Sequence, residues 1–147
     1  MDAVEKAANV IELDPEDTGV GYGGLPNEKG VVQLDASFMD GKTYSAGAVA
    51  CLENIKTPAS VAKLVMQHTD HVLLVGAGAL EFAKAWGFQE ENILTEKARK
   101  IWLRWKEEMS QDDDWGAPEH LRNIIKKESY WKNFPEDRNR TRLNSSN

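Results

Sequence analysis

Two histidines and one cysteine are the residues whose types could support metal or nucleophilic chemistry. His68 and His71 form an H-x-x-H pair, a spacing that can hold a metal ion when both imidazoles share one helix face. The expected helix ends near Thr69, so the two rings are predicted to diverge, and no cysteine or glutamate cluster completes a site. Cys51 lies in an apolar run of small residues, which favours a buried, inert thiol. The sequence therefore predicts no metal site, and it indicates no cofactor.

A glycine-containing turn follows one predicted strand and opens a predicted helix. Gly76 and Gly78 match half of a dinucleotide-binding fingerprint, in which glycines let backbone amides approach a pyrophosphate. Glu81 stands where the third glycine belongs, and its carboxylate would repel phosphate. No strand–helix–strand repeat surrounds the segment, so a tight strand-to-helix turn is favoured over a nucleotide site.

The remaining suggestive residues have simpler explanations. Trp102 and Trp105 are spaced i, i+3 and are predicted to pack a helix rather than to bind a substrate. The glycosylation-type triplets beginning at Asn139 and Asn144 are patterns that occur often by chance. Three arginines of the C-terminal tail are expected to be solvated: Arg138, Arg140 and Arg142.

Composition limits the classes of function. Among 147 residues, 18 lysines and arginines oppose 24 acidic residues, so the formal net charge is 18 − 24 = −6. Affinity for phosphate backbones comes mainly from basic side chains, so the charge argues against a nucleic-acid binder. No apolar run approaches the roughly 20 residues that a membrane span requires. One cysteine allows no internal disulfide.

The elements that must position any site form a mixed α and β pattern. An apolar spacing of three and four predicts a helix over residues 2–12, already under way at residue 2, which suggests that something upstream is missing. Period-two alternation predicts a strand over residues 32–39, and Asp40-Gly41 predicts a hairpin turn before a return strand over 42–51. The later elements follow in order: a helix from Pro58, a short buried strand at 71–75, a helix at 79–86 ended by Gly87, and a helix from Thr95. Residues 1–109 are predicted to form the folded core and residues 110–147 a solvated linker.

The ordered series of short motifs resembles a known family. The motifs that carry the resemblance are Asp2-Ala3-Val4-Glu5-Lys6, Gly19-Val20-Gly21-Tyr22-Gly23-Gly24-Leu25-Pro26-Asn27, Leu34-Asp35-Ala36, Met39-Asp40-Gly41, Ala46-Gly47-Ala48-Val49-Ala50, His71-Val72-Leu73-Leu74-Val75-Gly76 and Gly87-Phe88 with Glu91-Asn92. The series is similar to the α-subunit of glycosylasparaginase, in a family that also holds plant-type L-asparaginases and isoaspartyl peptidases. It covers about residues 2–105.

The resemblance implies an N-terminal-nucleophile hydrolase with an αββα sandwich, which this chain would fill only in part without a β-subunit. Members are made as one precursor that cuts itself just before a threonine. That threonine begins the β-subunit, its hydroxyl attacks the side-chain amide of an asparagine derivative such as N4-(β-N-acetylglucosaminyl)-L-asparagine, and its α-amine serves as the base. A free α-amine titrates near pH 8, so a neutral base is available beside the nucleophile. The implied partners are a Thr-initiated β-subunit, in a dimer of αβ units, and a small asparagine-derived substrate.

The chain departs from the family pattern at the nucleophile. Thr141 follows Arg140 without the sequence context expected at the cut, and Ser145 lies two residues before the end of the chain, so no catalytic residue is assigned here. Gly19 is assigned as a neighbour of the cleavage junction, at a position where glycosylasparaginases often have serine. Alternatives to an amidohydrolase subunit are an inactive structural or interaction remnant, a plant-type L-asparaginase or isoaspartyl peptidase subunit, and an unrelated acidic α/β module. The compartment stays open, because relatives are exported, lysosomal or cytoplasmic.

Overall fold

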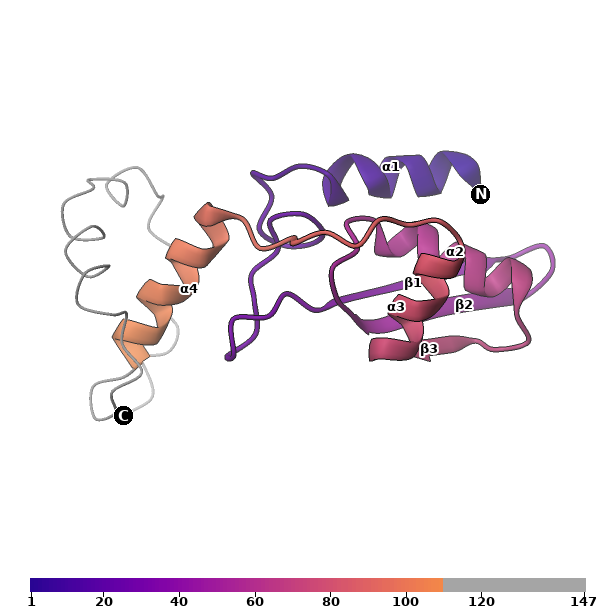
Figure 1. Ribbon diagram of the computed structural model, residues 1–147. Coiled ribbons are helices and arrows are strands. Elements are labelled where there is room, and N and C mark those ends of the chain that lie inside the picture. Colours follow the sequence, from indigo (N-terminus) through magenta and orange to yellow (C-terminus); the bar gives the residue numbers. More distant parts are fainter. Residues whose placement is uncertain (110–147) are drawn as a thin grey trace, which may run out of the picture.

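The computed structural model describes residues 1–109, and the predicted linker at 110–147 lies outside this part. The described residues form four helices and a three-stranded sheet (Figure 1). In chain order they are α1 (Asp2–Glu12), β1 (Leu34–Asp40), β2 (Ser45–Leu52), α2 (Pro58–His68), β3 (Leu73–Val75), α3 (Gly76–Ala85) and α4 (Glu96–Met109). The predicted order of elements is confirmed, and the fold is a mixed α and β one.

The sheet has the order β1-β2-β3, with β1 and β2 antiparallel and β2 and β3 parallel. Alternation along β1 turns Leu34 and Phe38 inward, where both are buried. Opposite Phe38 on β2 stands Gly47, and α2 lies directly above it. A methyl group at Gly47 would overlap the amide nitrogen of Met66 and would lie 2.7 Å from its Cα atom. The small residues of β2 thus allow the close helix–sheet packing that the sequence predicted.

Helices α2 and α3 cover the same face of the sheet and form the main core with it (Figure 1). Its fully buried side chains are Val49, Leu52, Ile55, Val61, Ala62, Val65, Ala79 and Ala83. A smaller cluster of Val32, Leu34 and Ile93 lies beside it. Burying apolar surface at roughly 25 cal/mol per Å² makes these clusters the main source of stability in the chain.

The opposite face of the sheet is open among the described residues. The register brings Leu73 beside Ala48 and Val75 beside Ala50 on that face, away from α2 and α3. The exposed fractions of Leu73 and Val75 are 51% and 52%, and that of Met39 on β1 is 63%. The predicted strand at 71–75 therefore exists in shortened form, but the prediction that it is buried was wrong. The cause is non-local, because nothing in the described part of the chain covers this face.

The connection between β1 and β2 in the hairpin is longer than the sequence predicted. The return strand begins at Ser45 rather than at residue 42, and residues 41–44 form the connection. The backbone amide of Tyr44 donates to the carbonyl of Asp40 at 2.8 Å, and Tyr44 itself adopts a φ of 59°. Asp-Gly correctly marked the turn, but the turn has four connecting residues instead of two.

Helix α4 ends the described chain at a distance from the sheet (Figure 1). The hydroxyl of Thr95 accepts a hydrogen bond from the amide of Ala98 at 3.2 Å, which caps the first turn. Trp102 packs over Gly30, as expected of a packing residue, since a Cβ atom at Gly30 would lie 3.1 Å from the indole ring. Trp105 is 44% exposed, so the prediction that both tryptophans pack was wrong for Trp105.

Candidate functional site

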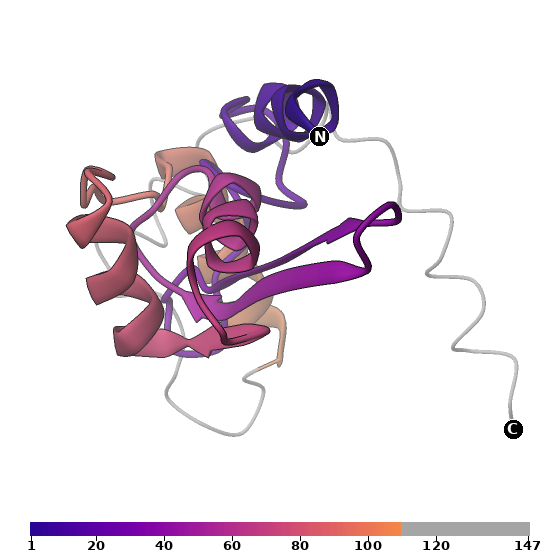
Figure 2. The same cartoon turned by 90° about the vertical axis from the view of Figure 1, so that its right-hand side faces the viewer.

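The glycine-rich loop, residues 19–24, begins at Gly19, the residue that the resemblance implies is a neighbour of the processing junction. Two consecutive residues of the loop, Tyr22 and Gly23, anchor it through backbone hydrogen bonds to different parts of the chain. The amide of Tyr22 donates to the carbonyl of Glu12 at 2.7 Å, and that of Gly23 donates to Ile93 at 3.2 Å. The loop therefore bridges the end of α1 and the segment before α4. Figure 2 shows α1 end-on at the top of the molecule.

Two glycines of this loop are required by the backbone. Gly21 has a φ of 63° and Gly23 a φ of 111°, conformations that side chains with a Cβ atom rarely adopt. A methyl group at Gly21 would also overlap the carbonyl of Glu12, lying 2.5 Å from its Cα atom. The tight turn and the close approach to α1 thus explain why this stretch is rich in glycine.

Gly19, the one site residue assigned from the sequence, has a different character. It is exposed, and its amide donates to the carboxylate of Asp17 at 2.7 Å. A Cβ atom there would meet only that carboxylate oxygen, at 3.0 Å. The position can therefore accept a side chain such as serine after a small shift of Asp17, and neither its backbone nor its surroundings require glycine.

Glu12 is the buried acid next to this loop, and no motif in the sequence indicated it. Its side chain is 5% exposed, and its Oε1 atom accepts the amide of Ala59 at 2.9 Å in the first turn of α2. Its Oε2 atom accepts the side-chain amide of Asn9 at 2.7 Å. Burial raises the pKa of the Glu12 carboxyl, and the hydrogen bonds from Ala59 and Asn9 oppose that effect. A glutamate in the last turn of a helix, two residues before Asp14-Pro15, gave no sequence signal for burial.

An ion-pair triad joins the other end of α1 to α2. Lys63 lies 2.6 Å from a carboxylate oxygen of Asp2 and 2.6 Å from one of Glu5. The lysine lowers the pKa of both carboxyls, first through its hydrogen bonds to them, and its own pKa is raised in return. Helix α1 is thus attached to α2 by polar side chains near both of its ends.

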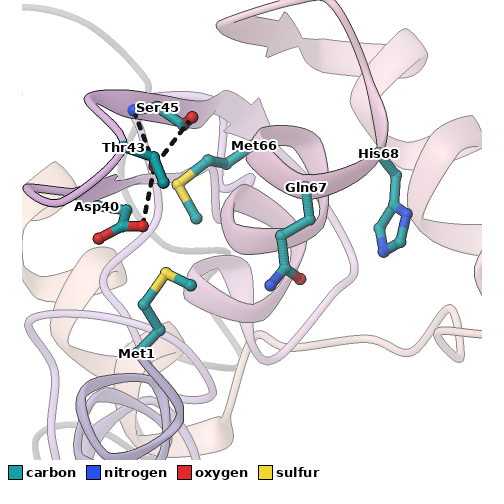
Figure 3. A pocket seen from close by; sticks show the side chains of 7 residues that line it. All are labelled: Met1, Asp40, Thr43, Ser45, Met66, Gln67 and His68. Carbon is teal, nitrogen blue, oxygen red and sulfur yellow. Dashed lines mark hydrogen bonds between the residues drawn. The ribbon is translucent and has the colours of Figure 1, made fainter.

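A shallow hollow of about 460 Å³ lies between the start of α1, the β1–β2 hairpin and the end of α2. Figure 3 shows the thioethers of Met1 and Met66 entering it, while His68 points away. Two of its polar groups bind each other, since the Thr43 hydroxyl donates to Asp40 at 2.9 Å. The hollow holds no arrangement of nucleophile and base.

The remaining candidates are separated by the fold. His68 ends α2 and its ring lies 4.3 Å from that of Trp86, whereas the backbone of His71 bonds to the Thr69 hydroxyl. Residues 1–109 contain no group of three or more histidine, cysteine or acidic side chains that could bind a metal ion.

The Gly76 region is the tight strand-to-helix turn that was favoured, since α3 begins directly after β3. In this same part of the chain, no helix has the length and apolar character needed to cross a membrane.

Cys51 is exposed, and the prediction of a buried thiol was wrong. The register between β1 and β2 shifts between Leu34 and Ala36, and Cys51 occupies the irregularity with a φ of 51°. Its amide donates to the carboxylate of Asp35 at 2.7 Å instead of to a strand carbonyl. A bulge of this kind depends on the pairing of two strands, so the composition of β2 alone could not reveal it.

Comparison with known proteins identifies relatives that agree with the motif series. The asparaginase family model matches residues 1–138. An N(4)-(beta-N-acetylglucosaminyl)-L-asparaginase of Elizabethkingia miricola is 53% identical over 105 residues, which cover 71% of this chain and 31% of the relative. A plant-type L-asparaginase of Pyrococcus abyssi is 46% identical over 113 residues, covering 77% of this chain and 37% of the relative.

A putative N(4)-(beta-N-acetylglucosaminyl)-L-asparaginase of Drosophila melanogaster is likewise 46% identical, over 77% of this chain and 29% of its own length. The chain thus spans about a third of the length of the curated relatives that it matches. The family match extends over far more than half of the chain, and it agrees with the order of motifs from α1 through α4. The chain belongs to the asparaginase family, whose named relatives are asparagine amidohydrolases.

Proposed function

We propose that this chain is the N-terminal, non-nucleophilic part of an asparagine amidohydrolase that acts on N4-(β-N-acetylglucosaminyl)-L-asparagine. The observation that carries the proposal is the family match over residues 1–138 in a chain that spans 31% of the bacterial relative. In this proposal residues 1–109 form the α-subunit core and 110–147 lead toward the processing site. The catalytic threonine and its α-amine belong to a second chain.

The open face of the sheet supports the need for a partner. Leu73, Val75 and Met39 expose half or more of their side chains there, beside the small residues of β2. Exposed apolar area on a sheet face is unfavourable in water and typically marks a surface that another layer covers. The proposed occupant is the sheet of a β-subunit that begins with threonine, which completes an αββα sandwich.

The glycine-rich loop supports the link to self-processing. Gly21 and Gly23 hold the loop in a conformation that few other residues adopt, which fixes the position of Gly19 at the surface. In the proposal, Gly19 lies beside the junction where the precursor is cut. Gly19 lacks the hydroxyl that glycosylasparaginases often place there, so cleavage in this protein proceeds without that group.

A plant-type L-asparaginase is the second candidate function, and the Pyrococcus abyssi relative at 46% identity favours it. The two candidates differ only in substrate, because both cleave the side-chain amide of an asparagine derivative. Glycosylasparagine is preferred here because the relative of that name is 53% identical.

The test is intact mass spectrometry of the natively expressed protein, with N-terminal sequencing of every chain that co-purifies. The proposal predicts a second chain that begins with threonine. The same preparation is then assayed with glycosylasparagine, asparagine and an isoaspartyl dipeptide, with glycosylasparagine cleaved most efficiently. Preference for asparagine would favour the plant-type function, and a protein that purifies without a Thr-initiated chain and hydrolyses none of the three would be an inactive remnant.

A further inference from the structure

The carboxylate of Glu12 occupies the N-terminus of α2, a helix that lacks a cap of its own. Thr57, at the N-cap position, makes no side-chain capping hydrogen bond. The Glu12 Oε1 atom instead accepts the amide of Ala59 at 2.9 Å, from 47 positions away in the sequence. A hydrogen-bond acceptor is favourable at this end of a helix, where unpaired N–H groups gather. Glu12 therefore links α1 to α2 as a cap supplied from another helix.

Asn9, which binds the second carboxylate oxygen of Glu12, is also held in one orientation. The Asn9 amide nitrogen donates to Oε2 of Glu12 at 2.7 Å, and the Asn9 amide oxygen accepts the hydroxyl of Ser60 at 3.2 Å. Asn9 and Glu12 lie on α1, whereas Ser60 lies on α2. Both oxygens of Glu12 are thus engaged in a small network that crosses the interface between the two helices.

The backbone of the same residue holds the glycine-rich loop. The carbonyl of Glu12 accepts the amide of Tyr22 at 2.7 Å, and Gly21 approaches the Glu12 backbone so closely that a methyl group would not fit. A displacement of the last turn of α1 would therefore displace Tyr22 and its neighbours. Through one residue, the position of the loop depends on the N-terminus of α2.

Helix α1 has no apolar anchor that could replace this link. Neither hydrophobic cluster of the described chain includes a residue of α1. Its apolar side faces outward instead, with Val4 64% exposed, Val10 68% and Ile11 46%. Docking of the last turn of α1 thus relies on the hydrogen bonds of Asn9 and Glu12.

We propose that Glu12 is a conformational latch: it ties the glycine-rich loop to the N-terminus of α2, and its protonation state sets how firmly the loop is held. This inference goes beyond the proposed function, since it concerns the position of the loop in the folded chain and needs no catalytic step.

The charged groups around Glu12 determine the direction of the pH effect. On α1 the carboxylate of Glu5 disfavours a second negative charge, and on α2 Lys63 is engaged by Asp2 and Glu5. The loop contributes no charged side chain; the ring of Tyr22 lies under the ammonium group of Lys56 at 4.5 Å. Burial is the largest influence on the Glu12 pKa and raises it above the ordinary value of 4.5.

The direction of the pH effect follows from the difference between the pKa of Glu12 when it is docked against α2 and when it is not. A docked Glu12 holds its proton to higher pH than an undocked one, so protonation favours the docked state. Between pH 4.5 and the pKa of docked Glu12, the equilibrium constant for separation of Glu12 from the N-terminus of α2 increases as the pH rises. The increase is at most about tenfold per pH unit, because one proton is released. The Asp2–Lys63–Glu5 triad has the opposite sign and acts at lower pH, because the pKa values of Asp2 and Glu5 are lowered.

The test is amide hydrogen exchange of the protein in its native assembly between pH 4.5 and 7, with protection factors corrected for intrinsic exchange at each pH. The amides of Ala59 and Tyr22 report the two ends of the latch. We expect both protection factors to fall together as the pH rises in the wild type and to become independent of pH in Glu12→Gln. The control is Glu81→Gln, an identical charge change at an exposed residue of α3, which should follow the wild type.

A second variant tests the mechanical link independently of pH. Glu12→Ala removes both acceptors, so Ala59 and Tyr22 should lose protection at every pH, while amides of the β1–β2 ladder keep theirs. Retained protection of Tyr22 in Glu12→Ala, or an unchanged pH dependence in Glu12→Gln, would overturn the proposal. So would a pH response of Ala59 that Tyr22 does not share.

Discussion

Gly47 of β2 lies so close to Met66 of α2 that no side chain fits between strand and helix. A methyl group would overlap the Met66 amide nitrogen and the Ala62 carbonyl, and these atoms belong to a hydrogen-bonded helix that cannot yield locally. The contact therefore sets the distance between the sheet and the helix that covers it.

Gly47→Ala should destabilise the protein through this contact. Overpacking a close-packed interior costs about 1–3 kcal/mol, and the rigid backbone on both sides favours the upper end of that range. The measurement is the free energy of unfolding in urea for the native assembly. Gly41→Ala is the matched control, because a Cβ atom at Gly41 meets nothing within 4 Å. Equal stabilities of the two variants would contradict the geometry.

Substitutions in the glycine-rich loop should have very different effects on stability at Gly19 and at Gly21. Gly19→Ser should be tolerated with a change in unfolding free energy within about 0.5 kcal/mol, as is usual for exposed positions. Gly21→Ser should lower the melting temperature strongly, because it combines a φ of 63° with overlap of the Glu12 backbone. Thermal unfolding of both variants, which make the same chemical change two residues apart, provides the comparison. Similar melting temperatures would show that the loop can rearrange.

The open sheet face should be needed for assembly with the proposed β-subunit. Leu73→Glu places a charge on the face that the partner would cover, where burial of an unpaired carboxylate is costly. We expect the variant to lose the co-purifying chain in a pull-down assay. Tyr44→Glu is the control, since Tyr44 is 81% exposed in the hairpin connection. Recovery of equal amounts of partner with both variants would place the interface elsewhere.

The isolated chain should lack a cooperative melt for the same reason. Residues 1–109 leave one face of the sheet uncovered and place β3 at its edge, so they expose apolar side chains and an edge strand. Differential scanning calorimetry of the chain purified alone should give a broad transition or aggregation. A sharp two-state transition of a monomer would instead indicate that the 147 residues are stable by themselves.

Acid should loosen the N-terminal half of α1. The pKa values of Asp2 and Glu5 are lowered by Lys63, so their stabilising contribution is present above the ordinary values of 3.8 and 4.5 and is lost as the pH falls below them. Protection of the α1 amides in hydrogen exchange should therefore decrease below about pH 4.5 in the wild type.

The variant Lys63→Met tests whether Lys63 causes the loss of α1 protection in acid. At pH 7 it should reduce α1 protection by about two- to fivefold, the range typical of ion pairs near a surface, and it should remove the further loss in acid. Lys84→Met is the control, because its ion pair with Glu90 is exposed and lies away from α1. An acid response of α1 that persists in Lys63→Met would assign it to other groups.

Local signals in the sequence were sufficient for the order and type of the elements. The Thr57-Pro58 pair marked the start of α2, Gly87 marked the end of α3, and alternation from Val32 to Phe38 identified the buried side of β1. The ordered motifs also indicated the asparaginase family, which the match over residues 1–138 confirms. Caps, breakers and periodicity act over a few residues, so they can be read without knowledge of the fold.

The surroundings of three side chains, those of Cys51, Leu73 and Glu12, were decided by the tertiary structure alone. Cys51 is exposed because a bulge against β1 interrupts the ladder, and Leu73 is exposed because no described segment covers its face of the sheet. Glu12 is buried because α2 offers it a free N–H group from 47 residues away. These outcomes depend on contacts between distant parts of the chain, which no local pattern encodes: the sequence by itself determined the elements and the family, and only their packing decided which polar groups are enclosed and which apolar ones are left open.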